Sequence, residues 1–527
     1  MGKVLNAEFA RAVNELAEMI CKGLIRDRQT LEREKIRVSK RYKLSRIPGN
    51  AQILNLLGSK GIDISLLRRK PARFSSGIYI FSVMCRPWPC PKKEPCYYCP
   101  GGAWSYFGST PQSYTGREPA ALRAIQNSFN PYEQVRKRLK QLKAIGHSPS
   151  KVELIVQGGT FPSMPRKYQE WFIKRCLDGL VRSDSHTLSE AVYNSEKAEI
   201  RNTGITVESR PETMTNEEIR FLLKAGVTRV EIGVQSVFND ILAKVNRGHG
   251  IEDVKKCFRR LKDYGLKVTA HMMPGLPGSN FKRDLESFKI LFEDKDLRPD
   301  GLKIYPTLVL RGTKIYDSFK RGEYTPPSLD ETIRLLATVK TFIPTYVRIY
   351  RIQRDIPAPL IEGGVKKSNL RQLVWRYMSE RGLRCRCIRC REVGRYILKG
   401  GSVEDLDPKL VRLDYEASGG EEIFLSFEDT EKDILIGFLR LRILPERNEG
   451  YIRELHVYGF QLGLGEKPIK TAAQHRGYGK RLVELAEKIS IEEYNIKVLR
   501  ITSGIGVREY YRRLGYKYES PYMVKKF

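Results

Sequence analysis

Short β-rich runs alternate with amphipathic stretches of helix length between about residues 77 and 357. Two of the helix-length stretches, 216–224 and 251–264, have apolar residues at helical spacing. This alternation predicts an α/β fold in which a parallel sheet with outer helices is closed or partly closed into a (β/α) barrel. The expected strands are residues 78–84, 152–156, 205–208, 229–234, 268–272, 302–306 and 347–351.

Polar residues gather where these expected strands end. In parallel barrels the carboxyl ends of the strands form the face that carries the active site. We therefore expect one site that several strands build together. The polar residues at the strand ends are Gly158, Gly159, Thr160, Glu208, Ser209, Arg210, Gln235, Ser236, His271, Lys303 and Tyr305.

Three cysteines, Cys90, Cys96 and Cys99, follow the first expected strand directly. Three thiolates on one loop can hold three irons of a four-iron cluster and leave the fourth iron open. The open iron can bind S-adenosylmethionine, whose reductive cleavage gives a 5′-deoxyadenosyl radical. A structural zinc loop with Cys85 as its fourth ligand is the alternative. The position of the loop at the carboxyl end of a strand favours the iron–sulfur cluster.

A second cysteine group, Cys385, Cys387 and Cys390, lies in a strongly basic stretch at 365–395. Three thiols with such short gaps predict a structural zinc site that joins the barrel to the following domain. Tetrahedral zinc needs a fourth ligand, which the sequence does not identify. Three reduced thiols without a metal are the alternative.

The residues after about 396 read as a separate α+β domain. Expected strands at 422–426, 434–443, 451–457 and 498–502 surround a glycine-containing turn and a helix at 480–493. Free N–H groups at the start of a helix bind pyrophosphate, and Gly477 and Gly479 remove side chains that would block it. In this strand–turn–helix setting the domain resembles the GNAT acetyltransferase fold, which binds acetyl-CoA.

The net charge of the chain indicates which class of macromolecule it binds. Lys and Arg total 94 against 61 Asp and Glu, a formal charge of +33, so a polyanion such as nucleic acid is expected to bind. The first 74 residues read as helical and basic, with a solvated helix face as the alternative to an RNA-binding surface. No apolar stretch reaches the ~18 residues of a membrane helix, and a cytoplasmic location is expected. The expected phosphate contacts are Lys22, Arg26, Arg28, Arg33, Lys35, Arg37, Lys40, Arg41, Lys43 and Arg46.

Several longer motifs resemble the catalytic subunit of Elongator. They are the segments 96–102 (CYYCPGG), 112–119 (QSYTGREP), 233–236 (GVQS), 246–249 (NRGH), 302–307 (LKIYPT) and 351–357 (RIQRDIP). The resemblance runs from about residue 75 to the C-terminus. It implies a radical-SAM barrel at 75–364, a cysteine-rich linker at 365–395 and a GNAT domain at 396–527, after a tRNA-binding region at 1–74.

The first cluster ligand departs from this family. Five residues separate Cys90 from Cys96, fewer than the family commonly has, and this makes Cys85 a rival first ligand. Cys90-Pro91 is similar to a Cys-Pro-His segment of the family, although Lys92 replaces the histidine. Cys90 is therefore the expected ligand.

The resemblance also implies roles for the remaining polar residues. Gly158, Gly159 and Thr160 would bind the methionyl part of S-adenosylmethionine, and Glu208 and Gln235 would contact its ribose or carboxylate. The alternative for Glu208 and Gln235 is a buried polar residue satisfied inside the barrel.

At the other cofactor, Tyr510 or Tyr511 would protonate the departing thiolate, with aromatic core packing as the alternative. Lys303 and Tyr305 would position or cleave the thioester. The acetyl-CoA contacts implied are Gln474, Arg476, Gly477, Tyr478, Gly479 and Tyr511, with Glu454 and His456 as weaker acid–base candidates.

The implied activity is C5 carboxymethylation of the tRNA wobble uridine from acetyl-CoA, with an electron donor that the sequence does not name. The rival reading is a protein lysine acetyltransferase whose iron–sulfur domain is structural. A non-catalytic RNA-binding scaffold is a third reading, but both cofactor motifs look complete. The intact cluster motif and the basic zones favour tRNA modification, because a protein acetyltransferase needs neither.

Overall fold

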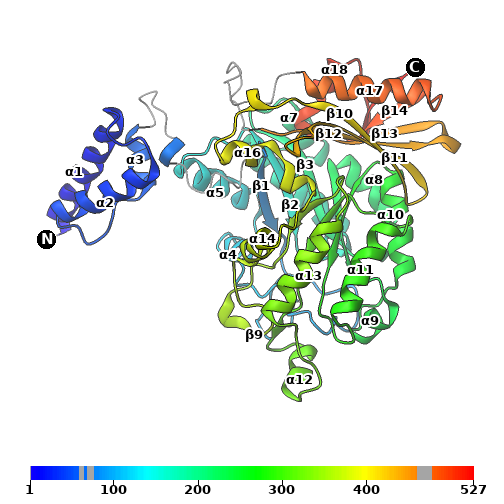
Figure 1. The fold of residues 1–527 in the computed structure, drawn as a ribbon, viewed down its shortest axis with the longest axis horizontal. Coiled ribbons are helices and arrows are strands. Elements are labelled where there is room, and N and C mark those ends of the chain that lie inside the picture. The colour runs from blue at the N-terminus through cyan, green and yellow to red at the C-terminus, as the bar shows by residue number, and fades with distance from the viewer. Residues whose placement is uncertain (1, 58–64, 68–75, 460–476) are drawn as a thin grey trace. The chain divides into compact units, whose positions relative to one another are not determined.

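The computed structural model describes residues 2–57, 65–67, 76–459 and 477–527. The chain divides into two compact units, which are coloured by residue number in Figure 1. One unit comprises residues 1–74 and 136–150, and the other comprises residues 75–135 and 151–527. The first unit thus covers the expected N-terminal region together with a segment, 136–150, that the sequence did not assign to it.

The helical unit packs its N-terminal helices around buried apolar residues such as Leu16 and Val38. Asp27 caps α2 by accepting a hydrogen bond from the backbone N–H of Thr30 at 2.8 Å, as an N-cap aspartate does. The elements are α1 (Gly2–Cys21), α2 (Arg28–Arg41), α3 (Asn50–Leu57) and the 3-10 turn η1 (Ser65–Leu67).

The second unit contains a seven-stranded, all-parallel sheet in the order β1-β2-β3-β4-β5-β6-β8. The order ends at β1 and β8, which do not pair, so the barrel is partial. All seven expected strands are present, which confirms the predicted fold class. The strands are β1 (Tyr79–Met84), β2 (Lys151–Gln157), β3 (Arg201–Ser209), β4 (Val227–Gln235), β5 (Lys267–Met272), β6 (Gly301–Ile304) and β8 (Arg348–Arg351).

Helices cover the outer side of this sheet (Figure 1). On α10 the buried residues Val254, Cys257, Phe258 and Leu261 recur at helical spacing, so one stripe of the helix faces the sheet. A short antiparallel pair, β7 (Val309–Leu310) and β9 (Ile361–Gly363), follows the carboxyl ends of the strands. The helices that lie wholly in this unit are α4 (Pro119–Ile125), α6 (Arg166–Val181), α7 (Leu188–Glu196), α8 (Asn216–Lys224), α9 (Asn239–Lys244), α10 (Ile251–Asp263), α11 (Phe281–Glu293), α12 (Lys314–Lys320), α13 (Leu329–Phe342), α14 (Leu370–Glu380), α15 (Ile388–Arg391) and α16 (Val393–Leu398). Helix α5 (Pro131–Ala144) begins in this unit and passes into the first unit at Arg136.

The C-terminal part of the same unit has a second seven-stranded sheet in the order β10-β11-β12-β13-β14-β16-β15. Its pairs are antiparallel except β13 with β14, which are parallel. Strands β10, β15 and β16 were not predicted. The elements are β10 (Lys409–Ala417), β11 (Gly420–Asp429), β12 (Ile434–Leu444), β13 (Glu449–Val457), α17 (Tyr478–Glu492), β14 (Val498–Ile501), α18 (Arg508–Arg512), β15 (Lys517–Glu519) and β16 (Tyr522–Lys526).

The C-terminal sheet packs against the amino ends of the barrel strands. Arg453 of β13 binds Asp300, the residue before β6, at 2.6 Å, and Glu454 lies 3.6 Å from Lys267, the first residue of β5. The loop that carries the first cysteine group follows the carboxyl end of β1. In Figure 1 the C-terminal sheet is accordingly at the top, while α9 and α12 are at the bottom.

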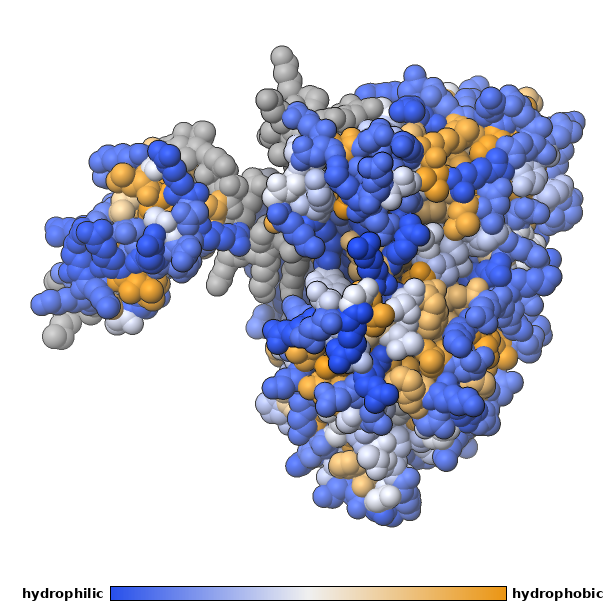
Figure 2. Space-filling model, in the orientation of Figure 1, coloured by the Kyte–Doolittle hydropathy of each residue, from blue (hydrophilic) through white to orange (hydrophobic). Residues whose placement is uncertain are grey.

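The face in view in Figure 2 is mostly hydrophilic on each unit, with smaller apolar patches. No helix among the described residues is both long enough and apolar enough to span a membrane.

Candidate active site

Cys96 and Cys99 lie together in a small apolar cluster at the carboxyl ends of the strands. The N–H of Cys99 donates to the carbonyl oxygen of Cys96 at 2.9 Å, and Cys96 is buried. Residues of α9 and of the loops after β4 and β5 surround them, among them Ile241 and Met273. The tight turn therefore places the two thiols against a closely packed apolar cluster.

Two guanidinium groups face the sulfur of Cys96. Arg247 Nη1 lies 3.6 Å and Arg210 Nη1 lies 3.8 Å from it. Burial opposes ionisation, but these charges outweigh it and lower the pKa of Cys96. The amide of Gln112 donates to the sulfur of Cys99 at 3.2 Å. A buried thiolate with cationic and amide donors around it fits a ligand of an iron–sulfur cluster.

Cys85 and Cys90 occupy different surroundings. The thiol of Cys85 is buried and donates to the carbonyl oxygen of Gln157 at 3.1 Å, and burial raises its pKa to about 12. Cys90 is half-buried on the loop that also carries Lys92. The thiol of Cys85 is turned toward the end of β2, whereas Cys90 lies on the loop that leads to Cys96, so this placement favours Cys90.

Gly158 and Gly159 face the carboxylate of Glu208. Their N–H groups lie 3.3 and 3.4 Å from its oxygen Oε2, and the hydroxyl of Tyr114 donates to both oxygens at 3.0 Å. A side-chain carbon at Gly158 would lie 2.0 Å from the sulfur of Cys85, so the backbone approach needs glycine there. Glu208 is buried, and the two glycines beside it are the same residues that the sequence assigned to the cofactor.

Gln235 and Thr160 complete this part of the site. Gln235 ends β4 with φ +75°, and its side-chain oxygen Oε1 is buried without a hydrogen-bond partner in the described residues. Such an orphaned acceptor at the end of a strand fits a polar ligand group. Thr160 is buried at the start of a 3-10 turn, where its N–H donates to the carbonyl oxygen of Gly158.

Lys303 and Tyr305 lie beside these residues. Lys303 is buried and forms an ion pair with Glu231, and the ring of Tyr305 meets the ring of His271 edge to face at 5.3 Å. Sequence reasoning noted His271 only as a strand end and did not name Glu231 at all.

The sulfur atoms of Cys385, Cys387 and Cys390 all lie within 4.8 Å of one another. No other group of three such ligands meets this condition in the part of the chain that the structure describes. The cysteines of a four-iron cluster bind separate irons, so Cys90, Cys96 and Cys99 need not meet it. Lys340 is buried 3.7 Å from the sulfur of Cys390, and its charge suits thiolates. The cysteine-rich linker thus holds a three-cysteine metal site.

The first turn of α17 has the features of an anion-binding helix start. Its N-cap is Gly477 with φ +82°, no side chain of the described residues caps it, and no acidic residue lies in the first turn. A side-chain carbon at Gly479 would lie 2.9 Å from the hydroxyl of Tyr510. These features fit a bound pyrophosphate. Tyr478 packs on Phe427 instead of pointing at the turn, and Gln474 and Arg476 lie outside the described residues.

The two candidate tyrosines differ in their surroundings. Tyr510 is 37% exposed beside Gly479, whereas Tyr511 is buried between the rings of Tyr510 and Tyr516. Burial raises the pKa of Tyr510 to about 12. Tyr510 is thus the more accessible of the two rings at α17, and Tyr511 packs between its neighbours.

Glu454 and His456 face the barrel. Glu454 accepts from Arg440 at 2.9 Å. Nε2 of His456 lies 3.2 Å from the carbonyl oxygen of Ser76, and its ring lies tilted, 4.1 Å from the ring of Tyr458. Burial lowers the pKa of His456 to about 4, so its imidazole is neutral at pH 7.

The expected RNA contacts are exposed with one exception. Lys35 is buried and pairs with Glu32 at 2.8 Å, so it stabilises the helical unit. The other nine side chains, from Lys22 to Arg46, are exposed to solvent.

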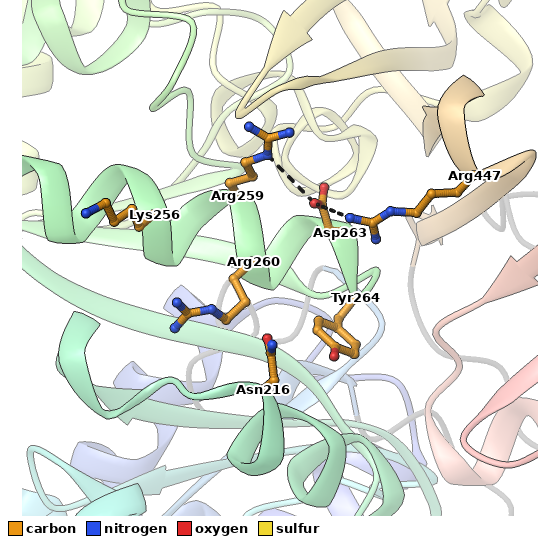
Figure 3. A pocket seen from close by; sticks show the side chains of 7 residues that line it. All are labelled: Asn216, Lys256, Arg259, Arg260, Asp263, Tyr264 and Arg447. Carbon is orange, nitrogen blue, oxygen red and sulfur yellow. Dashed lines mark hydrogen bonds and ion pairs between the residues drawn. The ribbon is translucent and has the colours of Figure 1, made fainter.

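A basic pocket of about 340 Å³ lies where α10 meets the turn before β13 (Figure 3). Arg259 and Arg447 approach the single carboxylate, Asp263, at 4.0 and 3.3 Å. The buried Arg442 already binds Asp263 at 2.6 Å. The pocket therefore keeps a positive excess. Its lining is Asn216, Lys256, Arg259, Arg260, Asp263, Tyr264 and Arg447.

Two exposed aromatic side chains follow the cluster cysteines. Trp104 is 87% and Tyr106 is 62% exposed. In the sequence they lie between Cys99 and two residues, Gln112 and Ser113, whose side chains contact the sulfur of Cys99. Exposed aromatic faces beside a site suit stacking of unpaired bases. Sequence reasoning passed over both, although an aromatic pair that follows a cysteine motif is visible in the sequence.

Arg247 and Gln112 were also missed as site residues, and Arg210 was noted only as a polar residue at a strand end. Each lies within or directly after a motif that the sequence singled out, so position alone could have suggested them. What the sequence could not provide was their convergence on two sulfur atoms.

Fold and site together define a radical-SAM enzyme joined to an acetyltransferase domain. Family models agree: the Radical SAM superfamily matches residues 90–290, the Radical_SAM C-terminal domain matches 299–380, and the Acetyltransferase (GNAT) family matches 395–516.

Full-length relatives narrow this class. The chain is 47% identical to a tRNA uridine(34) acetyltransferase of Methanocaldococcus infernus over 99% of both chains, and 43% identical to Elongator complex protein 3 of Bos taurus over 94% and 93%. A solved structure of the archaeal M. infernus Elp3, which lacks residues 1–46, superposes with a TM-score of 0.75 at 45% identity, covering 86% of this chain and all of that one. The chain belongs to the Elongator complex protein 3 family.

Proposed function

We propose that this enzyme modifies C5 of the wobble uridine of tRNA with a carboxymethyl group derived from acetyl-CoA. The observation that supports this most is the buried Cys96–Cys99 pair with two guanidinium groups, in the same compact unit as the uncapped helix α17. A protein acetyltransferase needs only the second feature. Relatives that span the whole chain are named tRNA uridine(34) acetyltransferase.

Cys90, Cys96 and Cys99 would hold a [4Fe-4S] cluster, with Arg247 and Arg210 balancing the charge of the thiolates. Gly158, Gly159, Thr160, Glu208 and Gln235 would bind S-adenosylmethionine. When bound, these groups supply a 5′-deoxyadenosyl radical that can take hydrogen from the acetyl methyl carbon. The surrounding apolar cluster excludes water from the reacting atoms.

On the acetyl-CoA side the N–H groups of Gly477, Tyr478 and Gly479 would bind the pyrophosphate. The hydroxyl of Tyr510 would donate a proton to the thiolate that leaves. Tyr511 supports it by packing against its ring. Because β13 and β14 meet the amino ends of the barrel strands, the acyl group has to travel along the barrel to reach the radical.

The nine exposed Lys and Arg side chains between Lys22 and Arg46 would contact tRNA phosphates, and the pocket around Arg259 would bind another phosphate. Trp104 and Tyr106 would stack with unpaired anticodon bases while the wobble uridine is flipped inward. Cys385, Cys387 and Cys390 would hold a structural zinc ion in the linker. The electron donor comes from outside the chain, and we place the enzyme in the cytoplasm.

Anaerobic reconstitution tests the proposal. The protein is loaded with iron and sulfide and incubated with S-adenosylmethionine, a reductant, acetyl-CoA and tRNA, and the nucleosides are analysed by mass spectrometry. We expect carboxymethyluridine that requires acetyl-CoA and is lost in Cys96→Ala. Acetyl-lysine on a protein partner, with no carboxymethyluridine, would overturn the proposal. Metal analysis of the same preparation reports zinc.

A further inference from the structure

Ionisable side chains fill the middle of the partial barrel, where barrels usually carry branched apolar residues. Glu231 of β4 is 1% exposed, and its oxygen Oε2 accepts hydrogen bonds from Lys303 Nζ and, at 2.9 Å, from His271 Nε2. Lys303 is 4% exposed. Buried charges are costly unless they are paired, so this arrangement needs an explanation beyond stability.

Strand register explains how the three side chains meet. Glu231 lies opposite Thr269 on β5, and His271 lies opposite Lys303 on β6. Glu231 is thus one level nearer the amino ends of the strands than its two partners. Its carboxylate therefore binds, from the amino-end side, His271 of β5 and Lys303 of β6.

The carboxyl-end side of this group borders the cysteine loop. The ring of His271 meets Tyr305, and Tyr305 packs on the apolar cluster that holds Cys96 and Cys99. Tyr305, Glu208 of β3 and Arg351 of β8 are the other groups that act on Lys303. The Lys303 ammonium therefore lies between the barrel interior and the radical-SAM site.

The charge state of Lys303 depends on its partner. Burial works against the ammonium, but the charge of Glu231 outweighs it, and the pKa of Lys303 is raised. Lys303 is accordingly a cation at neutral pH and donates hydrogen bonds. A free amine, which a nucleophile or a general base requires, is not formed there.

A second carboxylate in the barrel serves as a natural comparison. Glu153 of β2 accepts from Thr206 at 2.9 Å and pairs with Arg229, which also binds Tyr350 at 2.7 Å. Arg229 also lies 3.9 Å from Oε1 of Glu231, so it links the two carboxylates, but Glu153 does not itself pair with Lys303 or His271. We therefore expect that removal of its charge leaves the ion pair between Glu231 and Lys303 in place.

We propose that Glu231 is a positioning residue: it fixes Lys303 as an ammonium, beside His271, so that Lys303 donates a hydrogen bond to the carbonyl oxygen of the acyl group brought to the radical. This role rests on the proposed function, since the acyl group is that of acetyl-CoA. In this role Lys303 stabilises the acyl carbonyl oxygen electrostatically, and Glu231 keeps Lys303 charged and in place.

The first test needs no cofactor. Wild type, Glu231→Gln and Glu153→Gln are treated with acetic anhydride from pH 6 to 10, and acetylation of Lys303 is followed by peptide mass spectrometry. A fall of one unit in the pKa raises the free-amine fraction about tenfold. We expect Lys303 to react at least about tenfold faster in E231Q at pH 8, and E153Q to match wild type. Equal rates in E231Q and wild type would overturn the proposal.

The second test measures coupling as carboxymethyluridine formed per 5′-deoxyadenosine. In E231Q we expect 5′-deoxyadenosine to form nearly as in wild type while the ratio falls by about tenfold or more. Glu231→Asp keeps the charge but shortens the reach, so Lys303 should stay unreactive to the anhydride while the ratio falls. An unchanged ratio in both variants would refute the positioning role.

Stability and function are kept separate in this design. If E231Q does not fold, the double variant Glu231→Gln with Lys303→Met removes both charges, and Glu231→Asp alone then decides between the outcomes above. If wild type forms 5′-deoxyadenosine but no carboxymethyluridine, the proposed function fails, whereas the labelling result still reports on the Glu231–Lys303 pair.

Discussion

Arg348, the first residue of β8, donates a hydrogen bond of 2.8 Å to the hydroxyl of Tyr458, directly after β13 of the acetyltransferase domain. The same guanidinium binds Glu392 of the linker at 2.9 Å. One side chain thus joins barrel, linker and acetyltransferase domain at the amino ends of the strands. The domains are fixed to each other by a buried polar contact, and their relative position is part of the site.

Cys96→Ala should abolish the iron–sulfur absorbance and 5′-deoxyadenosine formation, because it removes the thiol that Arg247 and Arg210 face. Cys85→Ala is the matched control, since Cys85 donates to a backbone carbonyl and is held neutral. The ultraviolet–visible spectrum of reconstituted protein checks both. Loss of the cluster in C85A with retention in C90A would reverse the assignment of the first ligand.

Tyr510→Phe should leave the fold and acetyl-CoA binding intact and slow thioester cleavage, because only the exposed hydroxyl is removed. Tyr511→Ala should destabilise the domain by about 3 kcal/mol or more, as buried aromatic truncations do. Calorimetry and denaturant unfolding separate the two effects. A normal rate of thioester cleavage in Y510F would contradict the acid role.

Acid should weaken the fold through two histidines. Burial lowers the pKa of His249 and His456 to about 4, from 6.5. The unfolded chain therefore binds more protons below pH 6.5, and the free energy of unfolding falls as the pH drops from about 6.5 toward 4. Thermal unfolding midpoints at pH 6.5, 5.5 and 4.5 test this.

The carboxylates with lowered pKa values, such as Glu454, act in the same direction only below about pH 4.5. The effect of the histidines on the free energy of unfolding can therefore be measured apart from that of the carboxylates. His249→Gln with His456→Gln should flatten the decline between pH 6.5 and 4.5. A slope equal to that of wild type would show that other groups cause it.

Trp104→Ala should raise the KM for tRNA several-fold and leave kcat for 5′-deoxyadenosine unchanged, because stacking contributes about 1–3 kcal/mol per base. Tyr193, 69% exposed on α7, offers a control aromatic. Quenching of Trp104 fluorescence by tRNA is an independent readout. Equal KM values in W104A and Y193A would exclude stacking.

Charge reversal at Lys40, Arg41 and Lys43 should weaken tRNA binding and flatten the dependence of log K on log salt. The slope should fall by about one for each phosphate that the variant no longer neutralises. Arg259→Glu tests the basic pocket in the same way. Affinity measured at several salt concentrations checks both variants. Unchanged affinity and slope would mean that tRNA does not touch that surface.

The sheet of the barrel was predictable because each strand carries its own local signal. Runs such as 78–84 are mostly apolar, and parallel strands of this kind are short and buried. The cluster cysteines were predictable because they are close in sequence. Strands β10, β15 and β16 were missed because β10 is largely exposed, β15 has only three residues, and β16 has only two buried residues.

Long-range convergence was not predictable. Glu231 looks like an ordinary residue of a buried strand, and its role appears only when β4, β5 and β6 lie side by side. The separation of Tyr510 from Tyr511 likewise depends on which ring faces Gly479. Neither fact is encoded in spacing, since both arise from elements that meet only in the folded chain.

The acetyltransferase domain contacts the amino ends of the barrel strands, so the length of those strands sets a distance that the acyl group must cross. The nine residues of β4 rise roughly 30 Å at about 3.3 Å per residue. In the proposed function this length of barrel lies between the cluster and the acetyl-CoA site, so the arm that carries the acyl group must be long. An acetyl thioester too short to span this height should be hydrolysed without ever meeting the radical.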